Sequence, residues 1–190
     1  GSRRAFSMAN APHESMIELH LRLIKGGKFT SFVFNEMKEK SIHRIEGPIG
    51  QFYLRESEKP IVFIVGGTGF APIKSIIEDM IFNKNERKVH LYRGVRSKED
   101  FYMTDLVDIW NKKLKNFNYI PVVEDGLSQE ARSGFVHHAV LEDFKNLSDV
   151  QIYCCGAPGL VENAFLDLTK NGLPEDQFFA DAFTFAPKKK

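Results

Sequence analysis

The sequence predicts an α/β fold in which a doubly wound, five-stranded parallel sheet follows a smaller antiparallel region. From residue 60 onward, short β-type runs alternate with helical patterns, and this alternation is typical of a parallel sheet with crossover helices. The clearest runs are Ile61–Val65, Val89–Tyr92, Tyr119–Val123 and Gln151–Cys155. Earlier β-type runs, Met16–Ile24 and Ile49–Leu54, are bounded by glycine and proline turns. These earlier runs predict antiparallel strands.

Apolar side chains three and four residues apart predict the helices. A short helix is expected at Ser31–Lys40, and others near Phe135–Phe144 and Leu160–Lys170, the last ending at a left-handed cap at Asn171-Gly172. Two further helices place an apolar face toward the core: Ile73, Ile76, Ile77, Met80 and Ile81 in one, and Leu106, Ile109, Trp110 and Leu114 in the other.

Composition excludes several classes of protein. The 190 residues suffice for one large domain or a domain and a half, and 43% hydrophobic with 27% charged residues is typical of a globular chain. A net charge of +1 gives no electrostatic footprint for nucleic acid, and the apolar runs are too short for membrane insertion. The two cysteines, Cys154 and Cys155, point to opposite faces of a strand, so no disulfide or metal site is expected. A cytoplasmic protein fits, with Gly1-Ser2 resembling a cloning scar.

The segment Val65–Pro72, between a strand and a helix, is the most informative motif. Its glycines, Gly66, Gly67 and Gly69, let the backbone approach a ligand closely, and the N–H groups opening the next helix can face a phosphate. The same glycines also suit tight packing without any ligand, and their spacing is not the usual G-x-G-x-x-G. Taken alone, this turn leaves both interpretations open.

Four motifs in order give the chain its resemblance to the ferredoxin-NADP reductase family. Arg4–Ser7 matches that family's flavin motif R-x-[YF]-[ST], and Gly27–Thr30 matches its second flavin segment, G-x-x-[ST]. Gly66–Pro72 resembles its nucleotide-phosphate turn, and Cys155–Pro158 matches the C-G-x-P segment beside the nicotinamide. Tyr92–Arg96 and the ending Gly172–Phe183 look most like reductase components of aromatic-ring oxygenases and reductases of deoxysugar synthesis.

The resemblance implies a flavoprotein built from two parts. Residues 1–57 would be a partial FAD-binding β-barrel domain, residues 58–187 an NAD(P)-binding Rossmann-like domain, and residues 188–190 a tail. The implied activity is NAD(P)H-dependent reduction of FAD, with single electrons then passing to an iron-sulfur centre or protein acceptor. Relatives often carry a [2Fe-2S] domain, but two cysteines cannot supply its four thiolates, so such a cluster would lie outside this chain. Because the flavin motif begins at residue 4, we expect a largely colourless fragment that still binds nicotinamide nucleotide.

The resemblance also assigns roles to individual residues. Arg4, Gly27 and Thr30 would hold the flavin pyrophosphate, while Phe6 would stack on the isoalloxazine ring. Ser7, beside flavin N5, and Cys155, beside nicotinamide C4, are the catalytic candidates, tuned by Asp181. The C-terminal Phe183 would cover the flavin ring. The nicotinamide dinucleotide would be bound by Gly66, Gly67, Thr68, Gly69, Pro72, Cys155, Gly156 and Pro158.

Several questions stay open at this stage. Arg93 and Arg96 are expected to follow the second strand of the sheet, where an arginine favours NADPH, whereas the narrower resemblance favours NADH. His137 and His138, near a helix start, are expected to be surface or capping residues. Two alternative functions remain: a free-flavin reductase, and a non-catalytic nucleotide-binding or regulatory module.

Overall fold

A six-stranded parallel sheet forms the centre of the computed structural model, which describes residues 3–125 and 130–182. Its strands pair in the order β4-β3-β2-β1-β5-β6, and every pairing is parallel. The predicted count of five strands was one short. The strands are β1 (Ile61–Gly66), β2 (Val89–Val95), β3 (Phe117–Val123), β4 (Arg132–Ser133), β5 (Gln151–Gly156) and β6 (Phe178–Ala182).

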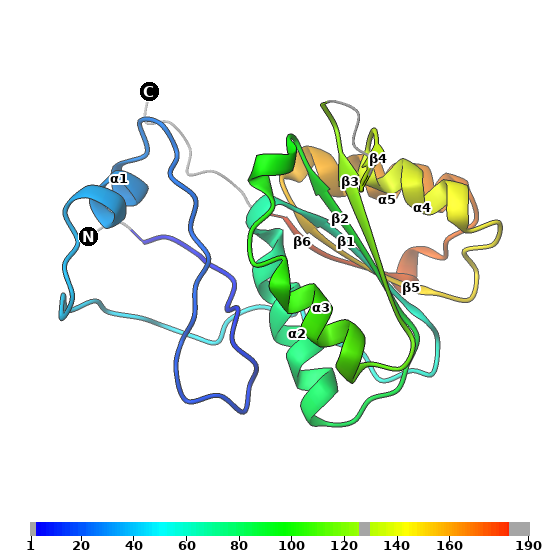
Figure 1. The fold of residues 1–190 in the computed structure, drawn as a ribbon, viewed down its shortest axis with the longest axis horizontal. Coiled ribbons are helices and arrows are strands. Elements are labelled where there is room, and N and C mark those ends of the chain that lie inside the picture. The colour runs from blue at the N-terminus through cyan, green and yellow to red at the C-terminus, as the bar shows by residue number, and fades with distance from the viewer. Residues whose placement is uncertain (1–2, 126–129, 183–190) are drawn as a thin grey trace.

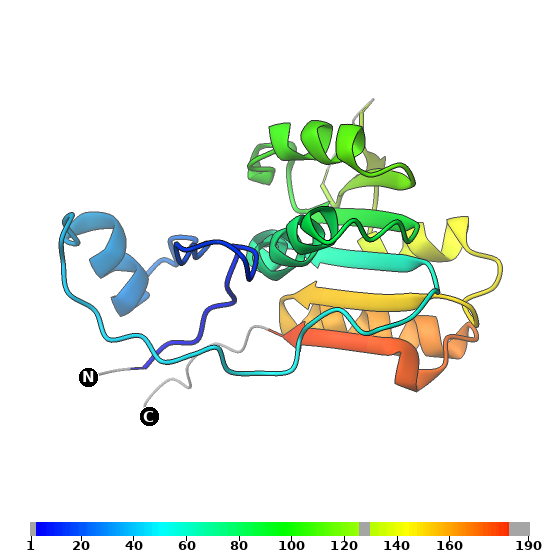
Figure 2. The same ribbon diagram turned by 90° about the horizontal axis from the view of Figure 1, so that it is seen from below.

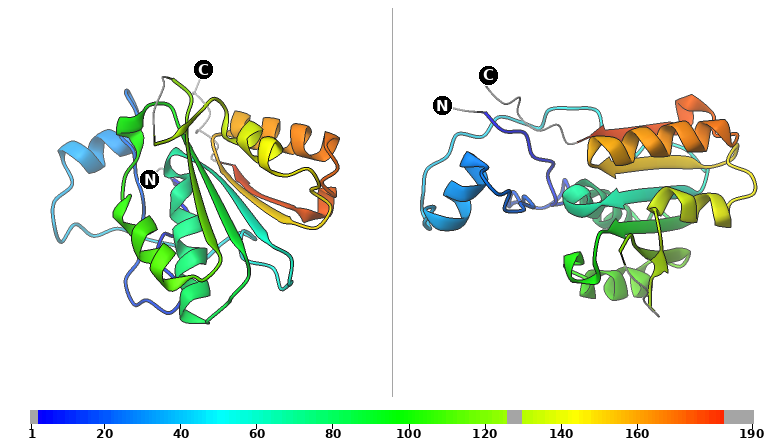
Figure 3. Two further views of the ribbon diagram at one scale, coloured as in Figure 1. Left: turned by 45° about the vertical axis from the view of Figure 1, so that its right-hand side comes forward. Right: turned by 90° about the horizontal axis from the view of Figure 1, so that it is seen from above.

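Helices cover both faces of this sheet, as the doubly wound prediction requires (Figures 1 and 3). On one face, α2 (Phe70–Phe82) and α3 (Asp105–Lys113) bury Phe70, Ile77 and Trp110 against the strands. On the other, α4 (Val136–Asp143) and α5 (Pro158–Lys170) bury a second apolar cluster. All four lie where the sequence pattern placed helices, but Ile109 was wrongly assigned to the core: it is 41% exposed, and Val107 packs inward instead.

Strand order fixes where a ligand would bind. Chain order runs outward from β1 through β2, β3 and β4, then returns to the other side of β1 for β5 and β6. The carboxyl ends of β1 and β5 therefore flank the point where the order reverses, and open α/β sheets bind ligands at such a point. Both strand ends are glycines, Gly66 and Gly156, whose backbones approach so closely that a Cβ on Gly156 would lie 3.3 Å from the Gly66 Cα.

The N-terminal segment, residues 3–57, differs from the prediction. The runs Met16–Ile24 and Ile49–Leu54 form no strands, and within residues 3–57 one isolated antiparallel bridge, Met8 to Leu19, is the whole β content. Strands depend on paired neighbours, and these runs have none to pair with. The expected helix forms earlier and is shorter, as α1 (Lys28–Asn35).

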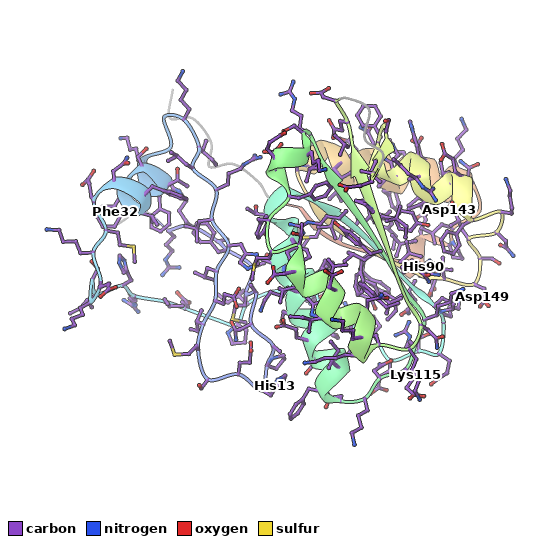
Figure 4. The ribbon with its side chains drawn as sticks, viewed as in Figure 1. His13, Phe32, His90, Lys115, Asp143 and Asp149 are labelled. Carbon is purple, nitrogen blue, oxygen red and sulfur yellow. The ribbon has the colours of Figure 1, made fainter. Side chains whose placement is uncertain are left out.

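Figure 2 shows this segment beyond the arrowheads of β1, β5 and β6, on the side of the carboxyl strand ends. Figure 4 places Phe32 of α1 well away from the sheet, whereas His90 lies within it. Short 3-10 turns complete the fold at Gly67–Gly69, Lys98–Asp100 and Glu175–Gln177. No helix among residues 3–125 and 130–182 is long and apolar enough to cross a membrane.

Candidate functional site: the carboxyl edge of the sheet

The three glycines of the turn after β1 have different structural causes. Gly67 has a φ of 53°, in the left-handed region, and a Cβ there would meet nothing within 4 Å. Gly69 is instead required by packing, because a Cβ there would lie 2.2 Å from the carbonyl oxygen of Cys155. A Cβ on Gly66 would meet only the end of the Leu160 side chain, at 2.6 Å. Gly67 therefore leaves backbone open to a phosphate, while Gly69 holds the turn against β5.

The second predicted motif, Cys155–Pro158, meets this turn directly. Cys155 and Gly156 end β5, and Pro158 opens α5 at a position where its missing N–H costs nothing. The contact between Gly69 and Cys155 places the two motifs at one edge of the sheet, as expected if both bind the same dinucleotide. Thr68 and Pro72 lie on either side of Gly69, with Pro72 buried in the first turn of α2.

The two cysteines point to opposite faces, as expected, with Cys155 in the cluster under α2 and Cys154 in the cluster under α4 and α5. Both thiols are free and fully buried. Burial raises the pKa of Cys154 to about 12, and burial, with Asp181 nearby, raises the pKa of Cys155 further. Cys155 is therefore a neutral, covered thiol, and a nicotinamide could contact it only if the groups above it move.

Residues from the two ends of the chain meet beside this edge. The Ser7 hydroxyl donates a 2.6 Å hydrogen bond to the carboxylate of Asp181 on β6. Asp181 is the strand partner of Cys155, so Ser7 is held one strand away from the thiol. Phe6 packs against Phe29 with ring centroids 5.5 Å apart. The predicted contribution of Phe183 lies outside the described residues.

Of the other candidate flavin-binding residues, Arg4 is available to a ligand, whereas Gly27 and Thr30 already make hydrogen bonds within the chain. The Arg4 side chain is exposed, and its guanidinium bonds only the neighbouring Arg3 carbonyl, at 2.7 Å, among the described residues. Thr30 is buried, and its hydroxyl is bonded within the loop to Ile24 and Gly27. The Gly27 N–H is also used, by the Ile24 carbonyl. Structural roles thus account for Gly27 and the Thr30 hydroxyl, and the donors left for an anion are the N–H groups in the first turn of α1.

Arg93 lies inside β2 rather than after it, contrary to the expectation. Its side chain is fully buried, with the guanidinium carbon 3.9 Å from the Phe70 ring centroid and 4.7 Å from that of Tyr102. Its nitrogens make no hydrogen bond of good geometry within the described chain, and burial lowers the pKa of Arg93. The strand periodicity could have revealed the burial of Arg93, because Leu91, Arg93 and Val95 lie on the same face of β2.

A buried lysine joins the N-terminal segment to α2. Lys74 is 5% exposed, and its ammonium donates to the Ala9 carbonyl, Glu18 and Glu78 at 3.3, 3.0 and 2.8 Å. Burial alone lowers the pKa of Lys74, but the bonds and charges of the two carboxylates outweigh it and the pKa is raised. Lys74 was not predicted as a site residue, although a lysine on the apolar face of a helix is an unusual signal.

The same network reaches the loop before α3. Glu18 lies 2.9 Å from Nε2 of His20, and Nδ1 of His20 lies 2.8 Å from the Tyr102 hydroxyl. Burial raises the pKa of Tyr102 to about 12, so its hydroxyl stays protonated. Residues 9–20 are therefore held against α2, through Lys74, and against Tyr102, whose ring lies over Arg93.

Arg96 follows β2 as expected, at the open edge. Its side chain is exposed and its Nε lies 3.0 Å from the carboxylate of Asp125. A separate shallow polar hollow, about 430 Å³, is lined by Ser57, Glu58, Asn85, Glu86, Arg87 and Lys88. It lies at the opposite, amino end of β1 and β2, away from both glycine motifs.

A doubly wound sheet whose glycine-rich turn meets a C-G-x-P segment at the switch point defines a nicotinamide-dinucleotide oxidoreductase domain. Residues 63–165 match the family described as Oxidoreductase NAD-binding domain, and residues 1–53 match Oxidoreductase FAD-binding domain. The chain belongs to this oxidoreductase family, the ferredoxin-NADP reductase type anticipated from its motifs.

Individual relatives make the assignment more specific. The chain is 45% identical to CDP-6-deoxy-L-threo-D-glycero-4-hexulose-3-dehydrase reductase of Yersinia pestis over 96% of its own length and 56% of the relative's. It is 37% identical to terephthalate 1,2-dioxygenase reductase component 1 of Comamonas sp, covering 98% of this chain and 56% of that protein. The crystal structure of Amycolatopsis cytochrome P450 reductase GcoB aligns with a TM-score of 0.88 and 29% identity, over 96% of this chain and 57% of that one. The chain thus spans little more than half the length of these relatives.

Proposed function

We propose that this chain is the hydride-accepting part of an electron-transfer reductase, with FAD and NAD(P)H meeting between the N-terminal segment and the carboxyl edge of the sheet. The observation that carries the proposal is the meeting of three motifs there: the turn at Gly66–Gly69, the segment Cys155–Pro158, and Ser7 bonded to Asp181. When bound, FAD would take a hydride from NAD(P)H and release single electrons to an acceptor.

The residues present fit both cofactors by their chemistry. The unobstructed backbone at Gly67, in front of the N-terminus of α2, suits a dinucleotide phosphate. Arg4, exposed and without an acidic partner among the described residues, supplies a guanidinium fork for a pyrophosphate. The protonated Cys155 thiol adds no charge next to a ring that gains or loses hydride.

Ser7 and Asp181 are the chain's own groups for handling a proton beside the flavin. The serine hydroxyl has its proton directed at the carboxylate in the present structure. Turning that hydroxyl would let it donate to a ring nitrogen instead, while Asp181 holds the side chain in place. We therefore assign Ser7 to orientation and hydrogen bonding, and Asp181 to positioning Ser7.

Chain reconstituted with FAD provides the test, followed anaerobically by flavin absorbance after NADH or NADPH is added. We expect bleaching with the wild type, and at least a roughly ten-fold slower rate with Ser7→Ala. Cys155→Ala removes the sulfur but little volume and should lower the rate while nucleotide affinity is retained. Phe34→Ala, an exposed change on α1, is the matched control. Bound flavin that neither nucleotide bleaches would refute the proposal.

Retention of FAD must be tested separately, because the two alternative functions differ from the proposal in whether the chain keeps a bound flavin. If the chain binds nucleotide by calorimetry but no FAD, a nucleotide-binding module is favoured. If it reduces added FMN or FAD without retaining either, a free-flavin reductase is favoured.

Arg96 bears on the choice between the two nucleotides. Its guanidinium already has a carboxylate partner in Asp125, which would compete with the 2′-phosphate of NADPH. We propose a preference for NADH on this ground. Asp125→Asn should then improve the relative rate with NADPH, because Arg96 is released, and unchanged selectivity would contradict it.

The electron acceptor is proposed by analogy alone. The relatives are named as reductase components of dioxygenase and dehydrase systems, so a [2Fe-2S] domain or partner protein is the proposed acceptor, in the cytoplasm. Oxidation of the reduced chain by a [2Fe-2S] ferredoxin, compared with oxygen alone, would measure that step.

A further inference from the structure

Two histidines and one aspartate converge between α4 and α5. His137 and His138 lie in the first turn of α4, and Asp167 lies on α5. The Nε2 atoms of His137 and His138 lie 3.2 and 3.6 Å from the same oxygen, Oδ2 of Asp167. All three atoms lie within 4.8 Å of one another. We propose that this cluster is a binding site for zinc or a similar divalent ion.

The two distances between histidine and aspartate atoms suit a tetrahedral ion. Two ligand atoms that each lie about 2.1 Å from zinc in tetrahedral geometry are about 3.4 Å apart. The observed separations of 3.2 and 3.6 Å between nitrogen and oxygen are on either side of that value. Small rotations of the exposed His138 ring would bring its nitrogen to the same centre. Water would take the fourth position, as it does in zinc sites with three protein ligands.

The chemistry of the ligands also fits. Imidazole binds metals through a ring nitrogen of its neutral form. Nδ1 of His137 is buried without a hydrogen-bond partner in the part of the chain that is described. Moving the ring proton from Nε2 to Nδ1 frees the Nε2 lone pair for the ion, so that coordination replaces the contact of Nε2–H with Asp167. The Nδ1–H donor then has no partner among the described residues.

The local surroundings predict which ligand matters most. Helix N-termini are positive and oppose a cation, so the two imidazoles need the carboxylate charge of Asp167. Phe135 packs against both rings, with centroids 5.9 Å from His137 and 5.6 Å from His138. His138 and Asp167 are half-exposed, so an ion can enter from solvent. An ion held here would tie α4 to α5.

Isothermal titration of the untagged chain with zinc sulfate tests the site. We expect one zinc per chain, with an affinity at least about ten-fold weaker in Asp167→Asn and in His138→Ala. Asp167→Asn is the decisive variant, because asparagine keeps an oxygen that accepts hydrogen bonds from the histidines but loses the charge. His137 is buried and its replacement could unfold the chain, so it is left intact.

His13→Ala is the matched control, because His13 lies in the N-terminal segment and stacks on Phe82 of α2. Figure 4 shows His13 far from α4 and α5, the two helices that carry the cluster. This variant should bind zinc as the wild type does, and circular dichroism should show all variants folded. Cobalt titration adds a second readout, because a tetrahedral site gives strong visible absorption. Absence of saturable zinc binding, or equal binding by Asp167→Asn, would overturn the proposal and leave an ordinary carboxylate that pairs with the two imidazoles.

Discussion

The sheet region, residues 58–182, and the N-terminal segment, residues 3–57, bury their apolar side chains very differently. In the sheet, two clusters of buried residues lie on either side of the strands. In the segment, many large apolar side chains are exposed, including Ile42 at 98%, Ile49 at 80% and Met16 at 76%. Its best buried residues, Ala9 and Ala11, lie where it touches α2. The sheet supplies its own core, whereas the segment is ordered by contact with the sheet.

The largest expected effect contrasts two phenylalanines. Phe63, in β1, is fully buried, and Phe34, in α1, is 52% exposed. Phe63→Ala should lower the free energy of unfolding by about 3–5 kcal/mol, because it leaves a cavity in the core. Phe34→Ala should change it by no more than about 0.5 kcal/mol. Urea denaturation measures both, and similar losses would contradict the contrast.

A second pair of variants tests the close approach at the strand ends. Gly69→Ala places a methyl group 2.2 Å from a backbone oxygen that cannot move aside, and should cost about 3 kcal/mol. Gly159→Ala, in the first turn of α5 with nothing within 4 Å of the new methyl, should stabilise by about 0.5 kcal/mol. Thermal melts compare them. Equal stability would mean that the glycine-rich turn is looser than its geometry implies.

A third, smaller effect concerns the join between the two regions. Lys74→Met leaves Glu18 and Glu78 without their ammonium partner and should cost about 1–3 kcal/mol. Hydrogen exchange should show faster opening in residues 9–20, with β1 and β5 unchanged. Ser57→Ala, at the amino edge of the sheet, serves as the control. A uniform increase in exchange across the chain would instead indicate global destabilisation.

The same join should depend on pH. Burial raises the pKa of Glu18, but bonds from His20 and Lys74 outweigh it, so the folded pKa is lower than the unfolded value of 4.5. Stability from this group is therefore present above pH 4.5 and lost as pH falls through the folded pKa. Exchange in residues 9–20 of the wild type should accelerate below that pH more than in Lys74→Met.

How far the sequence predicted the structure follows the same division. Around Ile61–Val65 and Gln151–Cys155, apolar runs and glycine turns agree with the sheet that forms, so strands, helices and the shared edge were predictable. The antiparallel strands predicted for residues 16–24 and 49–54 do not form, because β-type composition does not create a pairing partner. The hydrogen bond between Ser7 and Asp181, and the bonds of Lys74 to Ala9 and Glu18, depend on residues distant in sequence. No local pattern contains that information.

The hydrogen bond between Ser7 and Asp181 joins residues separated by 174 positions. Closing so long a loop carries a large entropic cost, and the bond can form only after β6 has joined its neighbour β5. During synthesis, the glycine-rich turn at Gly66–Gly69 is therefore present long before the bond between Ser7 and Asp181 can form. The hydrogen bond between Ser7 and Asp181 is therefore expected to form late in folding, after the local contacts of the sheet.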